Sequence, residues 1–329
     1  MKEAAVIILN WNGENFLREY LPKVIANTSQ DIADIIVADN GSTDGSLKLL
    51  AQEFPGVQVI RFRENHGFAE GYNKAISATQ YPYTVLLNSD VAPEKGWLEP
   101  LYRHMSAHPD TVACQPKIKA LTDPDRFEYA GACGGFLDIN GFPYCRGRIF
   151  DTVEEDRGQY DTTLEVFWAS GAALMVRTDA YIEAGGLDPS FFAHMEEIDL
   201  CWRMKLRGGK IYAIPEGTVY HLGGGTLPSS SPKKTYLNFR NNLLMLYKNL
   251  PAEQRKRRLI IRRLYDTIAL VKYAITFDFK NAKSIRKAHM DFRKMRRAPE
   301  NSPKRNLIAS ECNIIVDYYL RGKKKYSQL

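Results

Sequence analysis

The sequence predicts an α/β fold with a Rossmann-like, mainly parallel central sheet flanked by helices, followed by a basic helical C-terminal region. Three observations predict this arrangement. Short apolar runs alternate with amphipathic helical patterns at βαβ spacing through the first half of the chain. Three of these runs end in polar clusters, which is typical of strands that present a ligand site at one edge of a sheet. From residue 251 onward the pattern is helical and rich in Lys and Arg.

The expected elements of the first half follow one another at short intervals. Each apolar run is long enough for one buried strand, and each intervening segment has apolar residues at helical spacing. The expected strands are AAVIILN, DIIVAD, VQVIRF and YTVLLNSD, and the helices between them cover about residues 16–24, 47–50 and 68–78. We therefore expect a sheet that is covered by helices on both faces.

The middle of the chain is less regular. Residues 126–176 are rich in Gly and aromatic residues and contain the strand-like runs VFWAS and ALMVR. A helix is expected over residues 195–206, followed by the strand KIYAI. The segment GGGTLPSSSPKK, residues 223–234, has the composition of a mobile loop that could close over a ligand.

Composition indicates a globular protein of the reducing cytoplasm. Of 329 residues, 44% are hydrophobic and 25% charged, which is enough for a substantial core. The apolar stretch at residues 4–9 is too short for a signal-peptide core and suits a buried strand. The five cysteines are scattered without C-x-x-C spacing, so neither a zinc site nor a disulfide framework is expected.

Charge divides the chain into two parts. Residues 251–329 carry 21 Lys and Arg against 7 Asp and Glu, whereas residues 1–250 carry 24 against 31. The basic part is therefore expected to meet an anionic surface. Its most apolar stretch, residues 264–277, is shorter than the roughly 20 apolar residues of a spanning helix. It fits a basic amphipathic helix on an anionic membrane, or a packed helix with a solvated basic face. No nucleic-acid-binding motif is present, and no nucleic-acid partner is expected.

Two of the expected strands end at a carboxylate residue, and each carboxylate could have a functional or a structural role. Asp39 could bind a ribose hydroxyl or a base N–H, or it could only open the turn DNGSTD. Asp90, in the run NSD, could anchor Mg²⁺ or Mn²⁺ together with phosphate oxygens. Alternatively, it could only form part of a turn that leads into a helix. After the first strand the chain reads NWNGENF in place of G-x-G-x-x-G, which argues against a nicotinamide-dependent dehydrogenase.

The strongest local cluster is acidic and lies in the helix expected over residues 195–206. Glu196 and Asp199 share one helix face, whereas Glu197 points elsewhere. Neighbouring carboxylates repel one another when partly buried, which raises their pKa and suits a general base. The alternative is a helix N-terminus that favours acidic residues through its dipole, with Arg203 as a helical partner.

Two further segments have both a structural and a functional interpretation. His221 ends the run IPEGTVYH beside a glycine-rich loop, where it could be a metal ligand or a structural histidine. The segment NHGFAEGYN, residues 65–73, opens a helix with two glycines. Its backbone could approach a phosphate closely, or it could form an ordinary turn.

Seven motifs occur in a fixed order: VIILNWNG, IIVADNGSTDGS, NHGFAEGYN, LLNSDV, SGAALMVR, FAHMEEIDLCWR and IPEGTVYHLGG. Together they resemble the family-two inverting glycosyltransferases with the GT-A fold, in the rhamnosyltransferase-like branch. The resemblance spans about residues 4–245. It implies a catalytic domain over residues 1–245 and a separate basic helical region over residues 246–329, the candidate for membrane-surface association.

The resemblance also implies roles for individual residues. The nucleotide-binding residues would be Trp11, Asn12, Asp39, Asn65, Gly67, Asn73 and Asn88. Ser170, Gly171 and Ala172 would border the donor sugar, and Asp90 and His221 would hold Mg²⁺ or Mn²⁺. Glu197 would be the general base, with Glu196 and Asp199 in the same acidic motif. Two departures stand out: Asn88 replaces the first carboxylate of the D-x-D motif, and Glu197 replaces the usual Asp, which leaves the choice between Glu196 and Glu197 open.

The implied reaction is a single displacement with inversion. It would move a sugar from dTDP-rhamnose or a UDP-sugar to a hydroxyl of a glycan or lipid-linked glycan, in cell-surface polysaccharide synthesis. A catalytically silent nucleotide-sugar-binding scaffold is one alternative. The other is a sugar-phosphate nucleotidyltransferase, although NWNGEN is not the Gly- and Arg-rich loop expected of one. The expected location is the cytoplasm, including the cytoplasmic face of the membrane.

Overall fold

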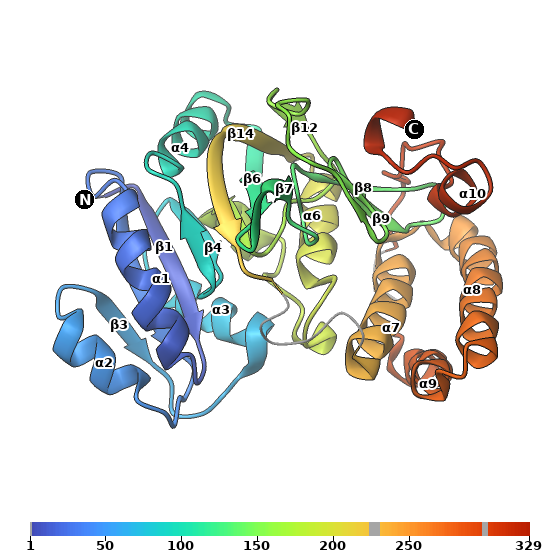
Figure 1. Cartoon of the computed structure of the whole chain (residues 1–329), viewed down its shortest axis with the longest axis horizontal. Helices are drawn as coiled ribbons and strands as arrows, with labels where there is room; N and C mark the ends of the chain where they lie inside the picture. Colours follow the sequence, from blue (N-terminus) through green and yellow to red (C-terminus); the bar gives the residue numbers. More distant parts are fainter. Residues whose placement is uncertain (1, 224–230, 298–301) are drawn as a thin grey trace.

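The computed structural model describes residues 2–223, 231–297 and 302–329, and its first half forms the parallel part of a large sheet (Figure 1). The elements of this half are β1 (Ala4–Asn10), α1 (Glu14–Asn27), β2 (Ala33–Asp39), α2 (Ser46–Glu53), β3 (Gln58–Arg61), α3 (Gly67–Ser77), β4 (Tyr83–Leu87), β5 (Val91–Pro93) and α4 (Leu98–Ala107). β1 pairs in parallel with β2 and β4, and β3 extends the sheet beyond β2. The predicted alternation of strands and helices is confirmed.

The next segment completes the sheet and makes it mixed. Its elements are β6 (Thr111–Ala120), β7 (Asp123–Phe127), β12 (Leu164–Glu165), β13 (Ala173–Arg177), α5 (Thr178–Glu183), the 3₁₀ turn η1 (Pro189–Phe191), α6 (Glu196–Leu206) and β14 (Lys210–His221). β13 lies antiparallel between β4 and β6, whereas β14 runs parallel to β6 and antiparallel to β5 and β12. The strand order is β12-β14-β6-β13-β4-β1-β2-β3. The parallel pairing predicted from the first half therefore does not extend through the whole sheet.

Between β7 and β12 lies a second, small antiparallel sheet that the sequence did not predict. It consists of β8 (Gly135–Leu137), β9 (Pro143–Cys145), β10 (Arg148–Ile149) and β11 (Thr152–Val153). The strand expected at VFWAS is wrong, because that run forms only an isolated bridge between Trp168 and Gly135. Val166, Phe167 and Trp168 are all buried, so the run lacks a solvent face and packs against other elements with every side chain.

The core lies on both faces of the large sheet. Alternate side chains of β1 enter different apolar clusters, with Ile7 in one and Ile8 in the other. Helix α3 covers the first face and α1 and α4 cover the second. The central parallel strands β1 and β4 are thus buried on both sides, which explains their continuous apolar runs in the sequence, whereas the edge strand β3 is partly exposed.

The C-terminal region is helical, as predicted, and lies at the opposite end of the molecule from β1–β3 (Figure 1). It contains α7 (Pro232–Asn249), α8 (Ala252–Ile275), α9 (Phe279–Met295), α10 (Ile314–Tyr319) and the 3₁₀ turn η2 (Tyr326–Gln328). The expected boundary at residues 245–246 falls inside α7. The end of the chain returns to the small sheet, where Ile314 and Tyr318 pack against Tyr144 and Ile149. Within the described ranges, no helix has both the length and the apolar composition for a membrane crossing.

Candidate active site

The carboxyl ends of β1, β2 and β4 meet at one edge of the sheet because the strands are parallel and in register. Asn10 of β1 lies opposite Asp39 of β2, and the Asn10 Nδ2 donates to Asp39 Oδ2 at 3.1 Å. Both side chains are 1% exposed. The backbone N–H of Ser42 donates to Asp39 Oδ1 at 3.0 Å. Asp39 therefore holds the turn after β2, and any nucleotide contact would use the remaining lone pairs of its oxygens.

The loops that follow β1 and β2 are hydrogen-bonded to each other and present a tryptophan to solvent. Asn12 adopts the left-handed region at φ 51°, and its Oδ1 accepts from the Thr43 N–H at 2.7 Å. Trp11 is 53% exposed next to this contact. An exposed indole is a surface on which a nucleobase can stack.

An asparagine that the sequence analysis did not single out connects β2 to α3. Asn40 is buried, its Oδ1 accepts from the His66 N–H, and its Nδ2 donates to Asn65 Oδ1 at 3.0 Å and to the Gly67 carbonyl at 3.0 Å. Gly67 has φ +76°, and a Cβ there would meet nothing within 4 Å. The N-terminus of α3 is thus held rigidly at the site edge and is open in front of Gly67, which suits an approaching anion.

The structure gives Asn73 a role different from the nucleotide contact that the resemblance implied. Its Nδ2 donates to the Leu187 carbonyl at 2.8 Å, and its Oδ1 accepts from Tyr181 Oη at 2.6 Å and from the Leu187 N–H at 3.0 Å. Both ends of the amide are used to attach α3 to the segment after α5. We therefore leave Asn73 out of the nucleotide site proposed below.

The segment 170–172 enters β13 directly beside the end of β4. The Ser170 N–H donates to the Gln115 side chain at 2.9 Å, and the Ser170 hydroxyl donates to the Ala130 carbonyl. The Asn88 N–H donates to the Ala172 carbonyl at 3.0 Å. A Cβ at Gly171 would lie 3.7 Å from the Cβ of Glu197. The expected donor-sugar segment therefore lies beside the expected base on one side and is hydrogen-bonded to Asn88 on the other.

Asp90 and His221 come together because β5 pairs with the end of β14. His221 lies opposite Val91, and the Leu222 N–H donates to the Asp90 carbonyl at 3.1 Å. The distance from His221 Nε2 to Asp90 Oδ1 is 3.2 Å, and from His221 Nε2 to Asn88 Nδ2 it is 3.3 Å. No group of three or more His, Cys, Asp or Glu side chains gathers as a metal site among the residues the structure covers. A metal at this pair would need further ligands from a bound diphosphate or water.

Glu128 supports His221 from its other side. Its Oε1 lies 3.6 Å from His221 Nδ1, and its Oε2 accepts from the Ala130 N–H. Burial alone would lower the pKa of His221, but its contacts with Asp90 and Glu128 raise that pKa to about 10. A carboxylate behind the second ring nitrogen is the usual arrangement around a metal-binding histidine, because it orients the ring. The donor set therefore fits a divalent cation at Asp90 and His221.

The acidic cluster begins α6, and its two glutamates differ in environment. Glu196 is buried, whereas Glu197 is partly exposed beside Gly171. Burial, together with the charges of Glu197 and Asp199, raises the pKa of Glu196 well above its usual range. Burial also raises the pKa of Glu197, to about 7. Glu197 is thus the one of the pair that can both reach a ligand and exchange a proton near neutral pH.

Asp199 serves to anchor α6. It is fully buried, and its Oδ2 accepts from Arg203 Nε at 2.8 Å and from Lys248 Nζ at 2.9 Å. Its Oδ1 accepts from Asn249 Nδ2 at 2.7 Å. Since two cations and an amide surround the carboxylate, the geometry favours a structural role for Asp199 over contact with a substrate.

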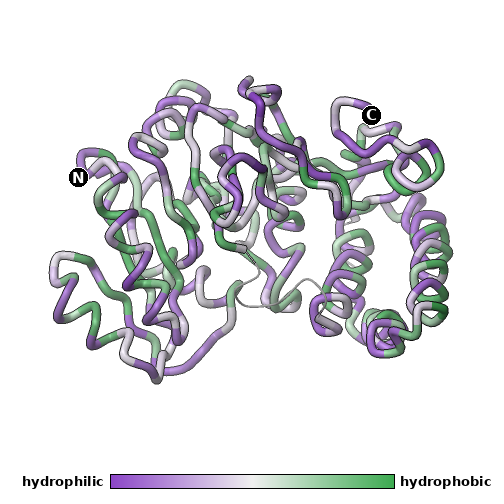
Figure 2. The backbone as a smooth tube through the Cα atoms, in the orientation of Figure 1, coloured by the Kyte–Doolittle hydropathy of each residue, from purple (hydrophilic) through white to green (hydrophobic). Residues whose placement is uncertain are grey.

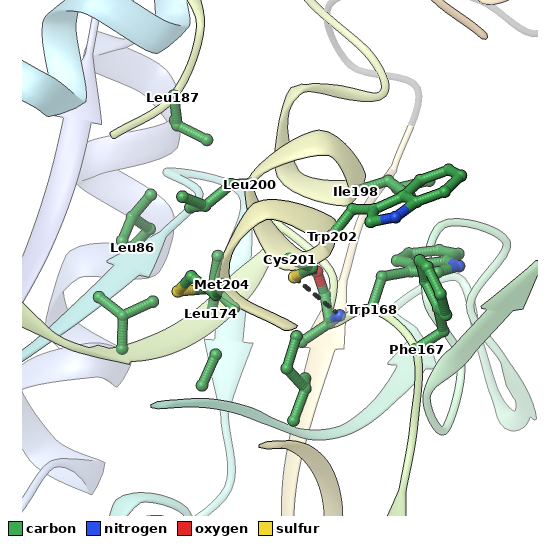
Figure 3. Packing of buried hydrophobic residues seen from close by; sticks show 14 of the residues in the cluster. Leu86, Phe167, Trp168, Leu174, Leu187, Ile198, Leu200, Cys201, Trp202 and Met204 are labelled. Atoms are coloured by element: carbon green, nitrogen blue, oxygen red, sulfur yellow. Dashed lines mark hydrogen bonds between the residues drawn. The ribbon is translucent and has the colours of Figure 1, made fainter. Parts of the chain in front are cut away.

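Apolar packing fixes the other face of α6 against the segment that leads into residues 170–172 (Figure 3). The rings of Phe167 and Trp202 meet edge to face, with centroids 5.3 Å apart. The Ala169 N–H donates to Cys201 Sγ at 3.5 Å, one residue before Ser170. The helix that carries Glu197 and the segment that carries Gly171 therefore behave as one packed unit.

The loop just before α6 is strained and is held by α7. Phe192, His194 and Met195 all have positive φ, between 67° and 74°, which costs roughly 1–3 kcal/mol for each residue. The Nδ2 of the buried Asn241 donates to the Phe191, Ala193 and His194 carbonyls at 2.9, 2.8 and 2.7 Å. Arg240 adds hydrogen bonds to the Ser190 and Phe191 carbonyls. Asn241 and Arg240 thus position the start of the acidic helix.

We expect Asn241→Ala to lower kcat for transfer by about 10–100-fold, because the loop that positions Glu197 would relax. The free energy of unfolding should fall by about 1–3 kcal/mol, since the loop carbonyls lose a buried donor. Transfer kinetics and urea unfolding measure the two effects. The matched control is Asn242→Ala, since the neighbouring buried amide donates to the Gly141 carbonyl instead. A similar loss of stability with near-normal kcat is expected there, and equal kcat in both variants would contradict the positioning role.

Four supporting residues were missed from the sequence: Asn40, Glu128, Arg240 and Asn241. Asn40 follows Asp39 directly in the motif IIVADNGSTDGS, so the sequence could have indicated that it lies at the site. Glu128 lies in the irregular part of the chain, and Arg240 and Asn241 lie far from the acidic motif in sequence. Only the folded chain brings these three residues to the site.

Comparison with known proteins identifies the family and supports the fold. Residues 5–177 match glycosyl transferase family 2. The N-acetylglucosaminyl-diphospho-decaprenol L-rhamnosyltransferase of Mycobacterium tuberculosis is 26% identical over 234 residues, which is 66% of this chain and 75% of that protein. The pre-mycofactocin glycosyltransferase of the same organism is 26% identical over 195 residues, covering 57% of this chain and 37% of that protein.

Solved structures resemble the chain in fold. GalNAc-T7 with UDP, GalNAc and Mn²⁺ has a TM-score of 0.58 at 16% identity, over 77% of this chain and 49% of that one. S. aureus TarS 1-349 in complex with UDP-GlcNAc has a TM-score of 0.54 at 14% identity, over 89% of this chain and 92% of that one. Since the family match covers more than half of the sequence and the fold agrees, the chain belongs to glycosyl transferase family 2 and is a glycosyltransferase with a GT-A fold.

Proposed function

We propose that this glycosyltransferase inverts the anomeric centre in a single displacement, with Glu197 as the general base. The observation that carries the proposal is a continuous series of neighbouring residues across the site edge. Glu197 lies beside Gly171, Ala172 is hydrogen-bonded to Asn88, and Asn88 lies 3.3 Å from His221, which faces Asp90. A base and a diphosphate-binding pair therefore flank the segment proposed to border the donor sugar.

The proposed nucleotide side is formed by the loops after β1 and β2 and by the start of α3. Trp11 offers a stacking surface, and Asn12 and Asp39 fix the loops around it. Asn65 and Gly67 present the N-terminus of α3, and Asn88 lies between the nucleotide and the pair Asp90–His221. When bound at that pair, Mg²⁺ or Mn²⁺ would offset the negative charge that grows on the leaving diphosphate.

In the proposed step, Glu197 accepts the proton of an acceptor hydroxyl while the hydroxyl oxygen attacks the anomeric carbon. The bond to the diphosphate oxygen breaks on the opposite face of the sugar, which inverts the configuration. Of the closing loop expected over residues 223–234, residues 224–230 lie outside the described residues. The expectation is wrong for residues 232–234, which form the first turn of α7. Glu196 is buried and has no part in the proposed proton transfer.

The pH dependence of transfer should report the titration of Glu197. Its pKa is raised to about 7, and only the ionised form can accept a proton, so kcat/KM should rise with pH and level off above about 7. Below that pH, kcat/KM should fall about tenfold per pH unit. Because Glu197 and Glu196 interact, the observed pKa belongs to the pair. Donor binding measured over the same range is the control and should not follow this curve. An unchanged kcat/KM on the acid side would argue against the carboxylate as base.

The proposed donor is dTDP-rhamnose, with a UDP-sugar as the alternative, and the proposed acceptor is a glycan or lipid-linked glycan in polysaccharide synthesis. The rhamnosyltransferase among the relatives supports the first donor, and TarS with UDP-GlcNAc supports the second. A screen of nucleotide sugars for metal-dependent thermal stabilisation would identify the donor. Release of nucleoside diphosphate in the presence of acceptor would then distinguish turnover from a silent scaffold. We propose that the protein works in the cytoplasm, at the inner face of the membrane.

A further inference from the structure

Helix α8 is amphipathic in the reverse of the usual sense. Five large apolar side chains are exposed along it, at fractions between 46% and 72%: Ile260, Leu264, Ile268, Val271 and Ile275. With 3.6 residues per turn they fall within an arc of about 80°. We call these five residues the α8 stripe. Exposed Phe277 and Phe279 extend it beyond the end of the helix. In Figure 2 apolar positions recur along this helix at the outer edge of the molecule.

The opposite face of α8, about 180° from the stripe, is buried and charged. Arg262 and Asp266 pair there at 2.9 Å and are 4% and 1% exposed. Arg262 also donates to Asn242 of α7 at 2.6 Å, and Asp266 contacts His289 of α9 at 2.9 Å. Ion pairs and hydrogen bonds therefore help to hold this face of the helix in place, whereas the five residues of the α8 stripe are left exposed. A continuous exposed apolar stripe of this kind is typical of a surface that contacts a membrane or another protein.

A cavity of about 360 Å³ adjoins the stripe between α7, α8 and α9. Its lining includes the apolar and aromatic side chains of Tyr247 and Phe292, and Ile260 belongs both to the cavity and to the stripe. Five cations line it: Arg255, Lys256, Arg263, Arg293 and Arg296. No carboxylate in the described ranges lies within ion-pair distance of these five. Arg255 donates to the Leu250 carbonyl and to the Ser302 hydroxyl. Cations without a carboxylate partner, next to apolar side chains, suit a phosphate attached to an apolar body.

We infer that α8 lies in the surface of an anionic membrane, with the α8 stripe inserted among the acyl chains and a phospholipid head group in the cavity. Both parts of the ligand are matched, since the stripe is apolar and the cavity beside it is cationic. The surrounding region is basic overall, with 21 Lys and Arg against 7 Asp and Glu in residues 251–329. A helix with this composition is held by apolar burial and by attraction to anionic lipids together. The inference deepens the proposed location at the inner face of the membrane and rests on it, but it concerns binding in the absence of donor and acceptor.

The test is co-sedimentation of the full chain with vesicles, without nucleotide or metal. We expect binding to vesicles of phosphatidylcholine and phosphatidylglycerol in equal parts, and much weaker binding to phosphatidylcholine alone. The double change Leu264→Ser with Ile268→Ser should lower affinity for the mixed vesicles by about tenfold or more. Arg263→Glu with Arg293→Glu should lower it by at least about tenfold, with weaker dependence on salt.

Matched controls use side chains that are exposed elsewhere. Ile182→Ser replaces an apolar residue of α5 that is 58% exposed, and Lys48→Glu reverses an exposed cation of α2. Neither should change vesicle binding, and thermal unfolding should show that all four variants fold. Wild-type binding that is equal on neutral and anionic vesicles, or absent on both, would overturn the inference.

Two other ligands give distinguishable results. If inorganic phosphate stabilises the protein through Arg263 and Arg293 while anionic vesicles do not bind, the cavity takes a free anion and the membrane inference fails. If the stripe variant changes a dimer into a monomer in sedimentation velocity without loss of vesicle binding, a second copy of the chain covers the stripe, and the inference fails as well. Failure of either kind leaves the assignments of Glu197 and Asp90 untouched, since those are read from transfer kinetics.

Discussion

Glu197→Gln should lower the rate of sugar transfer by about 10²–10⁴-fold, the usual contribution of a positioned general base. The amide keeps the shape of the side chain beside Gly171 but cannot accept the acceptor's proton. The donor does not depend on that proton, so its affinity should change little. Transfer is measured as nucleoside diphosphate release with acceptor present, and donor affinity by calorimetry. The loss should appear in kcat with little change in the KM for donor.

The matched control for this prediction is Glu196→Gln. Burial, the largest cause, raises the pKa of Glu196 well above its usual range. This favours the neutral carboxyl, which resembles an amide in shape and charge. The control should therefore retain transfer within about a fewfold of wild type and alter mainly the titration of its neighbour. If Glu196→Gln loses the activity and Glu197→Gln keeps it, the base has been assigned to the wrong residue of the pair.

Asp90→Ala or His221→Ala should abolish the effect of Mg²⁺ or Mn²⁺ and lower transfer by about 10²-fold or more, since a Lewis-acid cation supplies several kcal/mol. The two side chains face each other at 3.2 Å, and removing either leaves one protein ligand. The readout is the metal-dependent rise in thermal stability with nucleoside diphosphate present, followed alongside transfer.

A gain of function tests the same site in the other direction. Asn88 lies 3.3 Å from His221 at the position where the family's motif has a carboxylate. Asn88→Asp should therefore tighten metal binding, because a second carboxylate adds charge to the cation site. Full metal dependence in Asp90→Ala, combined with no effect of Asn88→Asp, would mean that the cation is held elsewhere.

Local patterns in the sequence predicted the elements that depend on neighbouring residues. The apolar runs of β1, β2 and β4 are continuous because both faces of a parallel strand are buried, so periodicity could identify them. The antiparallel insertion of β13 between β4 and β6 could not be predicted in this way. A run of five mainly apolar residues is equally compatible with parallel and antiparallel pairing. The direction of β13 in the sheet depends on the long connection from β6.

The sequence by itself determined the fold class, the basic helical end and the ordered motifs that place Asp39, Asp90, Glu197 and His221 at one site. Tertiary structure alone decided the environment of each acidic residue. Asp199 pairs with Lys248 of α7 and accepts a hydrogen bond from Asn249, whereas Glu197 lies beside Gly171. Glu128, Arg240 and Asn241 also join the site only through packing. The physical reason is that burial and charge pairing depend on contacts between residues distant in sequence, which no local pattern of residues encodes.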